Sequence, residues 1–87
     1  MDDAIKTVAP KYPYEDKALR HDGSGWFRLT VDLNTGSVSK VTVIKSTGFP
    51  KMDNEAEYAF RRWRWKPGKW KEIDIPITFT MRSGSPR

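Results

Sequence analysis

Residues 26–46 read WFRLTVDLNTGSVSKVTVIKS, and this stretch decides the fold of the 87-residue chain. Apolar and polar side chains alternate over residues 27–33, the period of two that is typical of a strand with one buried face. The Asn-Thr-Gly sequence at 34–36 supplies residues that tolerate positive φ. Residues 37–46 are therefore predicted to return as the second strand of a hairpin. A slip in their alternation between Val38 and Val41 predicts a bulge or a twist early in this strand.

The segment that follows the hairpin changes to a helical period. Its apolar residues are spaced i, i+4, i+7, i+8 and i+11: Met52, Ala56, Ala59, Phe60 and Trp63. Asp53 is predicted to be the N-cap, and basic residues gather at the C-terminal end, where the helix dipole favours them. Pro67 and Gly68 are expected to end the helix.

A last strand is predicted over residues 73–81, where isoleucine, phenylalanine and methionine alternate with polar residues or proline. Pro76 falls inside this run. Because proline has no N–H to donate to a neighbouring strand, the segment is expected at an edge of the sheet.

One more helix is predicted before the hairpin, opened by Tyr12 and Pro13 and ended near Arg20 by the turn-forming residues 22–25. The elements then follow the order αββαβ. This order predicts an α+β fold, a two-layer sandwich in which two helices cover one face of a three-stranded antiparallel or mixed sheet. A right-handed crossover places the first strand between the other two and leaves both outer strands as edges.

Length and composition allow one domain, because 87 residues are too few for two independent cores. Residues 9–81 are predicted to form this domain, between flexible tails at 1–8 and 82–87. The chain has no cysteine and one histidine, so neither a metal nor another cofactor is expected. No apolar run has the length of a membrane span.

Catalytic chemistry is not predicted either, because a nucleophile, a base and an orienting group must converge in one pocket. His21, the only histidine, stands beside Asp22 in a polar turn and is expected to be an exposed loop residue. Glu55 and Glu57 point to different sides of their helix. The Gly-Ser-Gly sequence at 23–25 precedes a strand, so it is interpreted as a turn and not as a phosphate-binding loop.

The net charge of +5 comes from one segment: residues 61–71 hold six Lys and Arg and no acid, which leaves ten basic against eleven acidic residues elsewhere. Three interpretations are open. In the first, Trp63 is buried in the core, and Arg61, Arg62 and Arg64 form a solvated rim that orients an acidic partner. In the second, the segment binds acidic protein or an anionic membrane surface. In the third, it binds nucleic acid through phosphate contacts and base stacking.

The edge strand offers a different kind of site. An exposed row of backbone donors and acceptors can receive another extended chain by β-augmentation. Only Asp74 and Pro76 protect this edge. Either the edge receives a partner strand, or the proline blunts it.

Several short blocks carry a family resemblance by their order and spacing: APKYP at 9–13, GSV at 36–38, KSTG at 45–48, MDNEA at 52–56, RRWRWKP at 61–67 and IPITF at 75–79. Together they resemble the C-terminal domain of the TonB energy-transducer family, over residues 9–81. The Arg-Arg-Trp-Arg-aromatic-x-Pro block is the most specific of them.

The resemblance implies a non-enzymatic, protein-binding domain without nucleic acid as a partner. In that family the domain stands in the periplasm, tethered by a proline-rich spacer and an inner-membrane helix that couples to a proton-driven motor complex. It grips the TonB box of an outer-membrane transporter and supports active uptake of scarce nutrients such as siderophores or vitamin B12. The tethering helix lies outside these 87 residues, and dimerisation through the domain's own edges stays open.

The same resemblance implies where the partner binds. The TonB box is expected to add as a strand along residues 73–79, with the neighbourhood of Tyr12 and Pro13 alongside. The predicted partner-binding residues are Tyr12, Pro13, Ile73, Asp74, Ile75, Pro76, Ile77, Thr78 and Phe79, with Arg61, Arg62 and Arg64 as an electrostatic rim.

Overall fold

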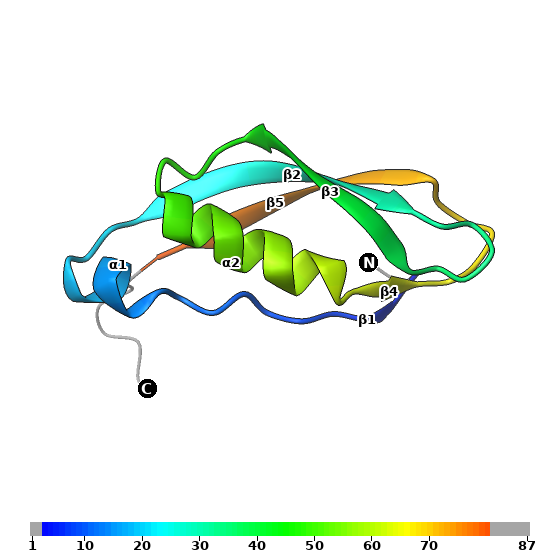
Figure 1. Ribbon diagram of the computed structural model, residues 1–87, viewed down its shortest axis with the longest axis horizontal. Helices are drawn as coiled ribbons and strands as arrows, with labels where there is room; N and C mark the ends of the chain where they lie inside the picture. The colour runs from blue at the N-terminus through cyan, green and yellow to red at the C-terminus, as the bar shows by residue number, and fades with distance from the viewer. Residues whose placement is uncertain (1–2, 81–87) are drawn as a thin grey trace.

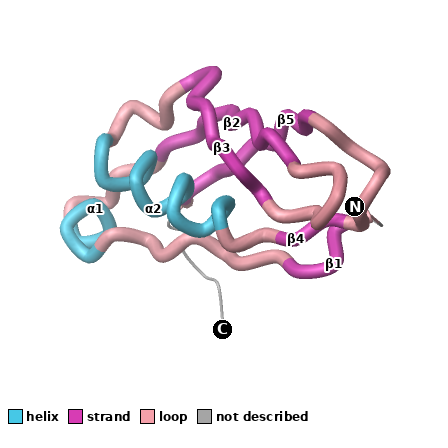
Figure 2. Tube along the Cα trace, turned by 45° about the vertical axis from the view of Figure 1, so that its right-hand side comes forward, coloured by secondary structure: helices cyan, strands magenta, loops and turns pink. Residues whose placement is uncertain are grey.

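The computed structural model describes residues 3–80, and within them it has a three-stranded sheet, a two-stranded sheet and two helices (Figure 1). In chain order the elements are β1 (Ala4–Lys6), α1 (Tyr14–Ala18), β2 (Gly23–Val31), β3 (Val38–Lys45), α2 (Pro50–Arg61), β4 (Arg64–Trp65) and β5 (Glu72–Phe79). Helix α2 lies across the three-stranded sheet, with α1 at one end of the molecule and the β1–β4 pair at the other (Figures 1 and 2). The predicted α+β fold is confirmed.

The three-stranded sheet has the order β3-β2-β5, and β2 is antiparallel to both neighbours. The predicted hairpin is therefore β2–β3, and the predicted central position of its first strand is confirmed. The β2–β3 register shifts between Thr30 and Val31, at the predicted bulge. In contrast, β2 and β5 pair without a shift from Gly23 opposite Phe79 to Thr30 opposite Glu72.

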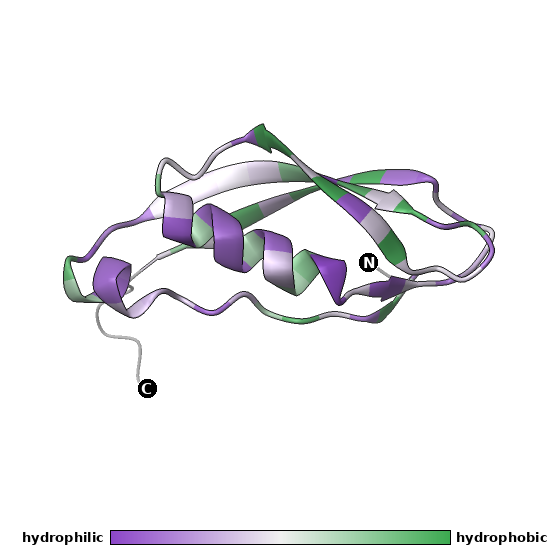
Figure 3. Cartoon of the chain, viewed as in Figure 1, coloured by the Kyte–Doolittle hydropathy of each residue, from purple (hydrophilic) through white to green (hydrophobic). Residues whose placement is uncertain are grey.

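The core lies between this sheet and α2, and polar and apolar positions alternate along β3 and α2 (Figure 3). The largest completely enclosed side chains come from both layers: Phe27, Leu29, Met52 and Phe60. Trp63 is buried as predicted. Leu33 is not: it was expected on the buried face but is 44% exposed, because β2 ends at Val31.

Helix α2 begins earlier than predicted, and Asp53 is not its N-cap. The helix starts at Pro50, which suits the first helical position, and Phe49 occupies the cap position. The Asp53 carboxylate lies in the first turn, where it accepts hydrogen bonds from Thr47 N (2.9 Å), Thr47 Oγ1 (2.7 Å) and Ser46 Oγ. Asp53 therefore fastens the loop after β3 to the start of the helix.

Replacing Asp53 by alanine is expected to lower the free energy of unfolding by about 1.5 kcal/mol at neutral pH, since hydrogen bonds to a charged group contribute about that much. Burial acts to raise the pKa of Asp53, but the hydrogen bonds from Ser46 and Thr47 outweigh it and hold the pKa below its ordinary value. The carboxylate therefore stabilises the fold above the unfolded pKa of about 4 and loses this contribution as the pH falls through its lower folded pKa.

Urea unfolding of both proteins, at neutral pH and along the acid range, measures this effect. The stability difference between Asp53→Ala and the unaltered chain should shrink as the pH falls below about 4. Asn54→Ala, an exposed change on the same helical turn, is the control. A difference that stayed constant with pH would show that the ionised carboxylate is not the stabilising group.

Strand β2 also begins earlier than predicted, because Gly23, Ser24 and Gly25 are its first residues and not a turn. Another part of the backbone passes very close to them. A Cβ on Gly25 would lie 2.5 Å from the carbonyl oxygen of Lys45, and one on Gly23 would lie 2.7 Å from that of Thr47. Glycine is therefore required at 23 and 25 because another backbone segment approaches the strand closely. In the sequence, the same Gly-Ser-Gly composition resembles a turn.

Residues 3–8, expected to be a flexible tail, are held in place. Strand β1 pairs antiparallel with β4, and Lys66 N donates a hydrogen bond to the Asp3 carbonyl oxygen (2.9 Å). Trp63 Nε1 donates to the Val8 carbonyl oxygen (2.9 Å). A buried indole N–H needs an acceptor, and this segment provides it.

Helix α1 is shorter than predicted, and Pro13 is its N-cap residue. His21 is not the exposed loop residue expected from the sequence. Its Nδ1 lies 2.8 Å from Oδ1 of the buried Asp16, and its ring stacks on Phe49 with 4.4 Å between centroids. His21 is thus a structural contact that joins α1 to the start of α2.

Candidate functional site

The outer edge of β5 is the candidate site. Within residues 3–80, β5 pairs with β2 on one side and with no strand on the other. Val31 N donates to the Lys71 carbonyl oxygen (2.8 Å), so residues 31 and 71 form a hydrogen-bonded pair. Because such pairs alternate along an antiparallel ladder, the odd-numbered residues of β5 bond to β2, and the even-numbered residues turn their backbone groups outward.

Four residues therefore present free backbone groups at this edge: Glu72, Asp74, Pro76 and Thr78. All four offer a carbonyl oxygen, and all except Pro76 offer an N–H. Pro76 removes a single donor from the middle of the row, and donors remain on both sides of it.

The opposite edge of the sheet, on β3, is less suited to receive a strand. Its pairing with β2 has two register shifts, and it carries the exposed lysines Lys40 and Lys45. Bulges and edge lysines are devices that discourage edge-to-edge pairing. The ladder of β2 and β5 has eight residue pairs without a register shift, so the outer edge of β5 is the more regular template.

The predicted residues of β5 divide into two groups. Asp74, Pro76 and Thr78 are exposed and lie at the free edge. The odd-numbered residues bond to β2, and their side chains face the core side: Ile75 and Phe79 are buried, and Ile73 and Ile77 are half-buried. Glu72 also belongs to the free edge but was not predicted. It lies four residues before Pro76, and residues an even number apart in a strand turn their backbone groups to the same side, so this spacing was the signal that could have found it.

Tyr12 lies beside the far end of β5. Its ring packs edge-on against Phe79 with 5.6 Å between centroids, and its hydroxyl donates to the His21 carbonyl oxygen. Partial burial, helped by the charge of Asp22, raises the pKa of Tyr12. Pro13 is buried and lines a shallow pocket of about 580 Å³. The other lining residues are Tyr14, Glu15, Ala18, Leu19 and Lys51, with Lys51 paired to Glu15.

The outer face of the sheet beside this edge carries a cross-strand ion pair. Arg28 donates from Nε to Asp74 Oδ1 (2.8 Å) and from Nη2 to Oδ2 (3.1 Å). The hydrogen bond and charge of Arg28 lower the pKa of Asp74. Because both side chains are substantially exposed, the pair contributes little stability. The pair fixes the orientation of the Asp74 side chain and neutralises its charge. Asp74 lies near Pro76, and the half-exposed Trp26 lies opposite Pro76 on β2.

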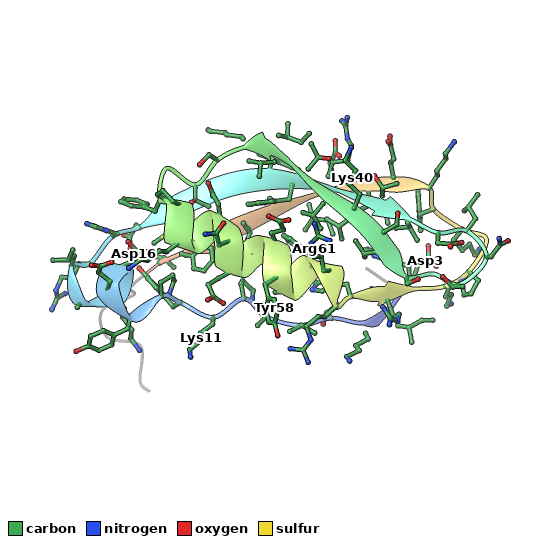
Figure 4. The ribbon with its side chains drawn as sticks, in the orientation of Figure 1. Asp3, Lys11, Asp16, Lys40, Tyr58 and Arg61 are labelled. Carbon is green, nitrogen blue, oxygen red and sulfur yellow. The ribbon has the colours of Figure 1, made fainter. Side chains whose placement is uncertain are left out.

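The three arginines of the predicted rim lie at the end of α2 and on β4. Arg61 pairs with Glu57 (2.9 Å), and the Arg62 guanidinium lies 5.7 Å from the centroid of the Tyr58 ring; Figure 4 labels Arg61 and Tyr58 on α2. Arg64 is exposed. The contacts of Arg61 and Arg62 thus lie within α2 and its end, and not on β5.

The nucleic-acid interpretation of the basic segment loses two of its stacking platforms. Trp63 is 9% exposed and Trp65 is 3% exposed, and the two rings pack against each other inside the core. They are not available to bases. In residues 3–80 no group of three His, Cys, Asp or Glu could hold a metal, and no helix of this part is both long and apolar enough to cross a membrane.

Comparison with known proteins agrees with this fold. The chain is 30% identical over 73 residues to Protein TonB of Neisseria gonorrhoeae, covering 83% of this chain and 26% of the relative. It is 32% identical over 66 residues to Protein TonB of Escherichia coli K12, covering 76% and 27%. It therefore spans about a quarter of the length of these relatives.

A solved structure shares the fold: the solution NMR structure of Pseudomonas aeruginosa TonB CTD, with a TM-score of 0.70 at 22% identity, over 97% of this chain and 88% of that one. Residues 8–81 match the family described as Gram-negative bacterial TonB protein C-terminal. The chain therefore belongs to the TonB C-terminal domain family.

Proposed function

We propose that this chain is the partner-binding domain of a TonB-type energy transducer, and that it holds the TonB box of an outer-membrane transporter as an added strand on β5. Membership of the family supports the first part. The observation that carries the second is the regular edge formed by residues 72–78, whose outward backbone groups have no partner strand among residues 3–80. In this role the domain stands in the periplasm, is tethered to the inner membrane and its motor complex, and has no enzymatic activity.

The geometry suits the transmission of force. Strand β5 pairs with β2 along its whole length, so a load applied to it is shared by the centre of the sheet. A partner strand pulled along the edge strains several backbone hydrogen bonds together. Each contributes only about 1 kcal/mol net, so the shared arrangement is what resists the pull and passes it to the transporter.

Replacing Thr78 by proline is expected to weaken binding of a TonB-box peptide about tenfold while the domain stays folded. The N–H of residue 78 points outward, so β2 loses no hydrogen bond, and proline is tolerated at an edge strand. The domain loses one N–H donor, and one carbonyl of the bound peptide is left unpaired, a change of about 1.4 kcal/mol. Isothermal titration calorimetry with a transporter-derived TonB-box peptide measures the affinity.

Thr78→Val is the matched control. It removes the contact of Thr78 Oγ1 with Ser24 Oγ (3.3 Å) but keeps the backbone N–H, and it should bind like the unaltered domain. Amide shifts in the unaltered domain should concentrate on residues 72, 74 and 78. Equal affinities for the valine and proline variants would exclude strand addition at this edge, and a failure of the unaltered domain to bind any TonB-box peptide would contradict the proposed partner.

A further inference from the structure

Two loops and the N-terminal segment meet at the end of the molecule opposite α1 (Figures 1 and 2). The loop after β2 touches the loop before β5, where Gly68 N donates to the Leu33 carbonyl oxygen (2.8 Å). Lys66 N reaches the backbone of Asp3, which Figure 4 labels at this end. These hydrogen bonds hold both loops against the body of the domain, so their outward side chains project from a fixed base.

Two large apolar side chains project there. Trp70 is 46% exposed and Leu33 is 44% exposed. The indole Nε1 of Trp70 donates to the Asp3 carboxylate (2.7 Å), so the single polar hydrogen of the ring is satisfied within the protein. The exposed part of the ring is therefore apolar surface, and the hydrogen bond to Asp3 fixes its orientation.

Three lysines surround this tryptophan in the chain: Lys66, Lys69 and Lys71, all exposed. None of them takes part in the ion pairs found among residues 3–80. Asp3 accepts from Trp70, and Asp32 accepts from the backbone N–H of Asn34 (2.8 Å). Neither of them, nor Glu72 after Lys71, belongs to an ion pair found among residues 3–80. We call Leu33, Lys66, Lys69, Trp70 and Lys71 the lysine-tryptophan tip.

We propose that the lysine-tryptophan tip docks on the surface of a bilayer that contains anionic phospholipids. Tryptophan prefers the depth of the headgroups, and lysines extend their stems over apolar surface while their charges meet phosphate. The tip also projects from the end of the molecule, a shape that fits a broad planar surface better than a narrow peptide. This docking uses side chains outside the free edge of β5 and does not depend on the proposed TonB-box binding.

Partition of the 87-residue chain onto vesicles tests the proposal. The chain should sediment with vesicles of phosphatidylcholine containing about 30% phosphatidylglycerol, far less with phosphatidylcholine alone, and less at high salt. Each lysine near an anionic surface strengthens partition about fivefold, so the triple variant Lys66→Gln, Lys69→Gln, Lys71→Gln should partition about a hundredfold more weakly.

The matched control neutralises the exposed lysines Lys11, Lys17 and Lys45, away from the tip, and changes the net charge equally. Its partition should fall by no more than about threefold, because screening limits the reach of distant charges to about 10 Å. Equal losses in the two triple variants would overturn the proposal, since net charge alone would then explain the binding. No partition of the unaltered chain onto anionic vesicles would also overturn it.

The position of the tryptophan gives a second readout. Brominated lipids should quench part of the tryptophan emission on binding, and Trp70→Phe should lose this quenching while Trp26→Phe, half-exposed on the sheet, keeps it. Circular dichroism confirms that both variants are folded. Quenching that survives Trp70→Phe would overturn the proposal, as would tip-dependent binding to polyglutamate without binding to vesicles, which would identify an acidic protein as the partner.

Discussion

A Gly36→Ala variant is expected to lose at least about 4 kcal/mol of unfolding free energy, a large part of what holds a domain of this size together. Gly36 has φ of 79°, in the left-handed region that favours glycine. A Cβ at this position would lie 1.9 Å from the carbonyl oxygen of Trp65. Since that oxygen belongs to a backbone segment, the hairpin and β4 would have to separate to relieve the overlap.

Gly48→Ala is the control, because it separates the strain of a positive φ from the steric overlap with a neighbouring backbone segment. Gly48 also has a positive φ, 94°, but a Cβ there would meet nothing within 4 Å. It should lose about 1 kcal/mol from backbone strain alone. Urea unfolding followed by circular dichroism compares the two variants. If they were equally destabilised, the close approach of Gly36 to Trp65 would not be a stabilising feature of the fold.

Gly36 also illustrates how far the sequence could predict the fold. Its place in a turn followed from the Asn-Thr-Gly sequence, because positive φ is a local property. Its contact with Trp65 joins residues 29 positions apart, and no local pattern contains that information. The hairpin, the helix that follows it and the edge strand were all predictable, though not their exact bounds, because period and proline placement are local signals.

Three of the differences between prediction and structure share one physical origin. The glycines at 23 and 25 resemble a turn because the backbone of residues 45–47, which passes close to them, is distant in sequence. His21 resembles an exposed residue because Phe49 is 28 positions away. In residues 3–8 apolar and polar side chains do not alternate as they do in a strand, yet β4 and the Trp63 indole N–H hold them. Each of these features depends on a long-range contact.

The candidate site was predictable to the same extent. Pro76 correctly indicated an edge strand, since the missing donor restricts where such a strand can lie. Which residues of β5 face outward required the register with β2, and so Glu72 was missed while Ile75 and Phe79, which face inward, were included. The basic segment was divided by the fold: its first two tryptophans lie in the core, and Trp70 lies at the exposed tip.

Trp63→Ala is expected to lower the free energy of unfolding by about 3 to 5 kcal/mol, the range for removing a large aromatic side chain from a core. Trp63 follows the last turn of α2 and is 9% exposed. Its ring packs against those of Phe60 and Trp65, with 5.1 Å and 5.8 Å between centroids. Its Nε1 donates a hydrogen bond to the Val8 carbonyl oxygen. One side chain thus joins the helix, β4 and the N-terminal segment.

Two further variants divide this loss into its parts. Trp70→Ala makes the same chemical change at a half-exposed position and should lose less than about 1 kcal/mol. Trp63→Phe keeps most of the apolar ring but removes the donor to Val8, so hydrogen exchange should speed up in β1 while β2 and β5 stay protected. If Trp63→Ala were as mild as Trp70→Ala, Trp63 would belong to the surface after all, and the basic segment would regain the stacking platform that the nucleic-acid interpretation requires.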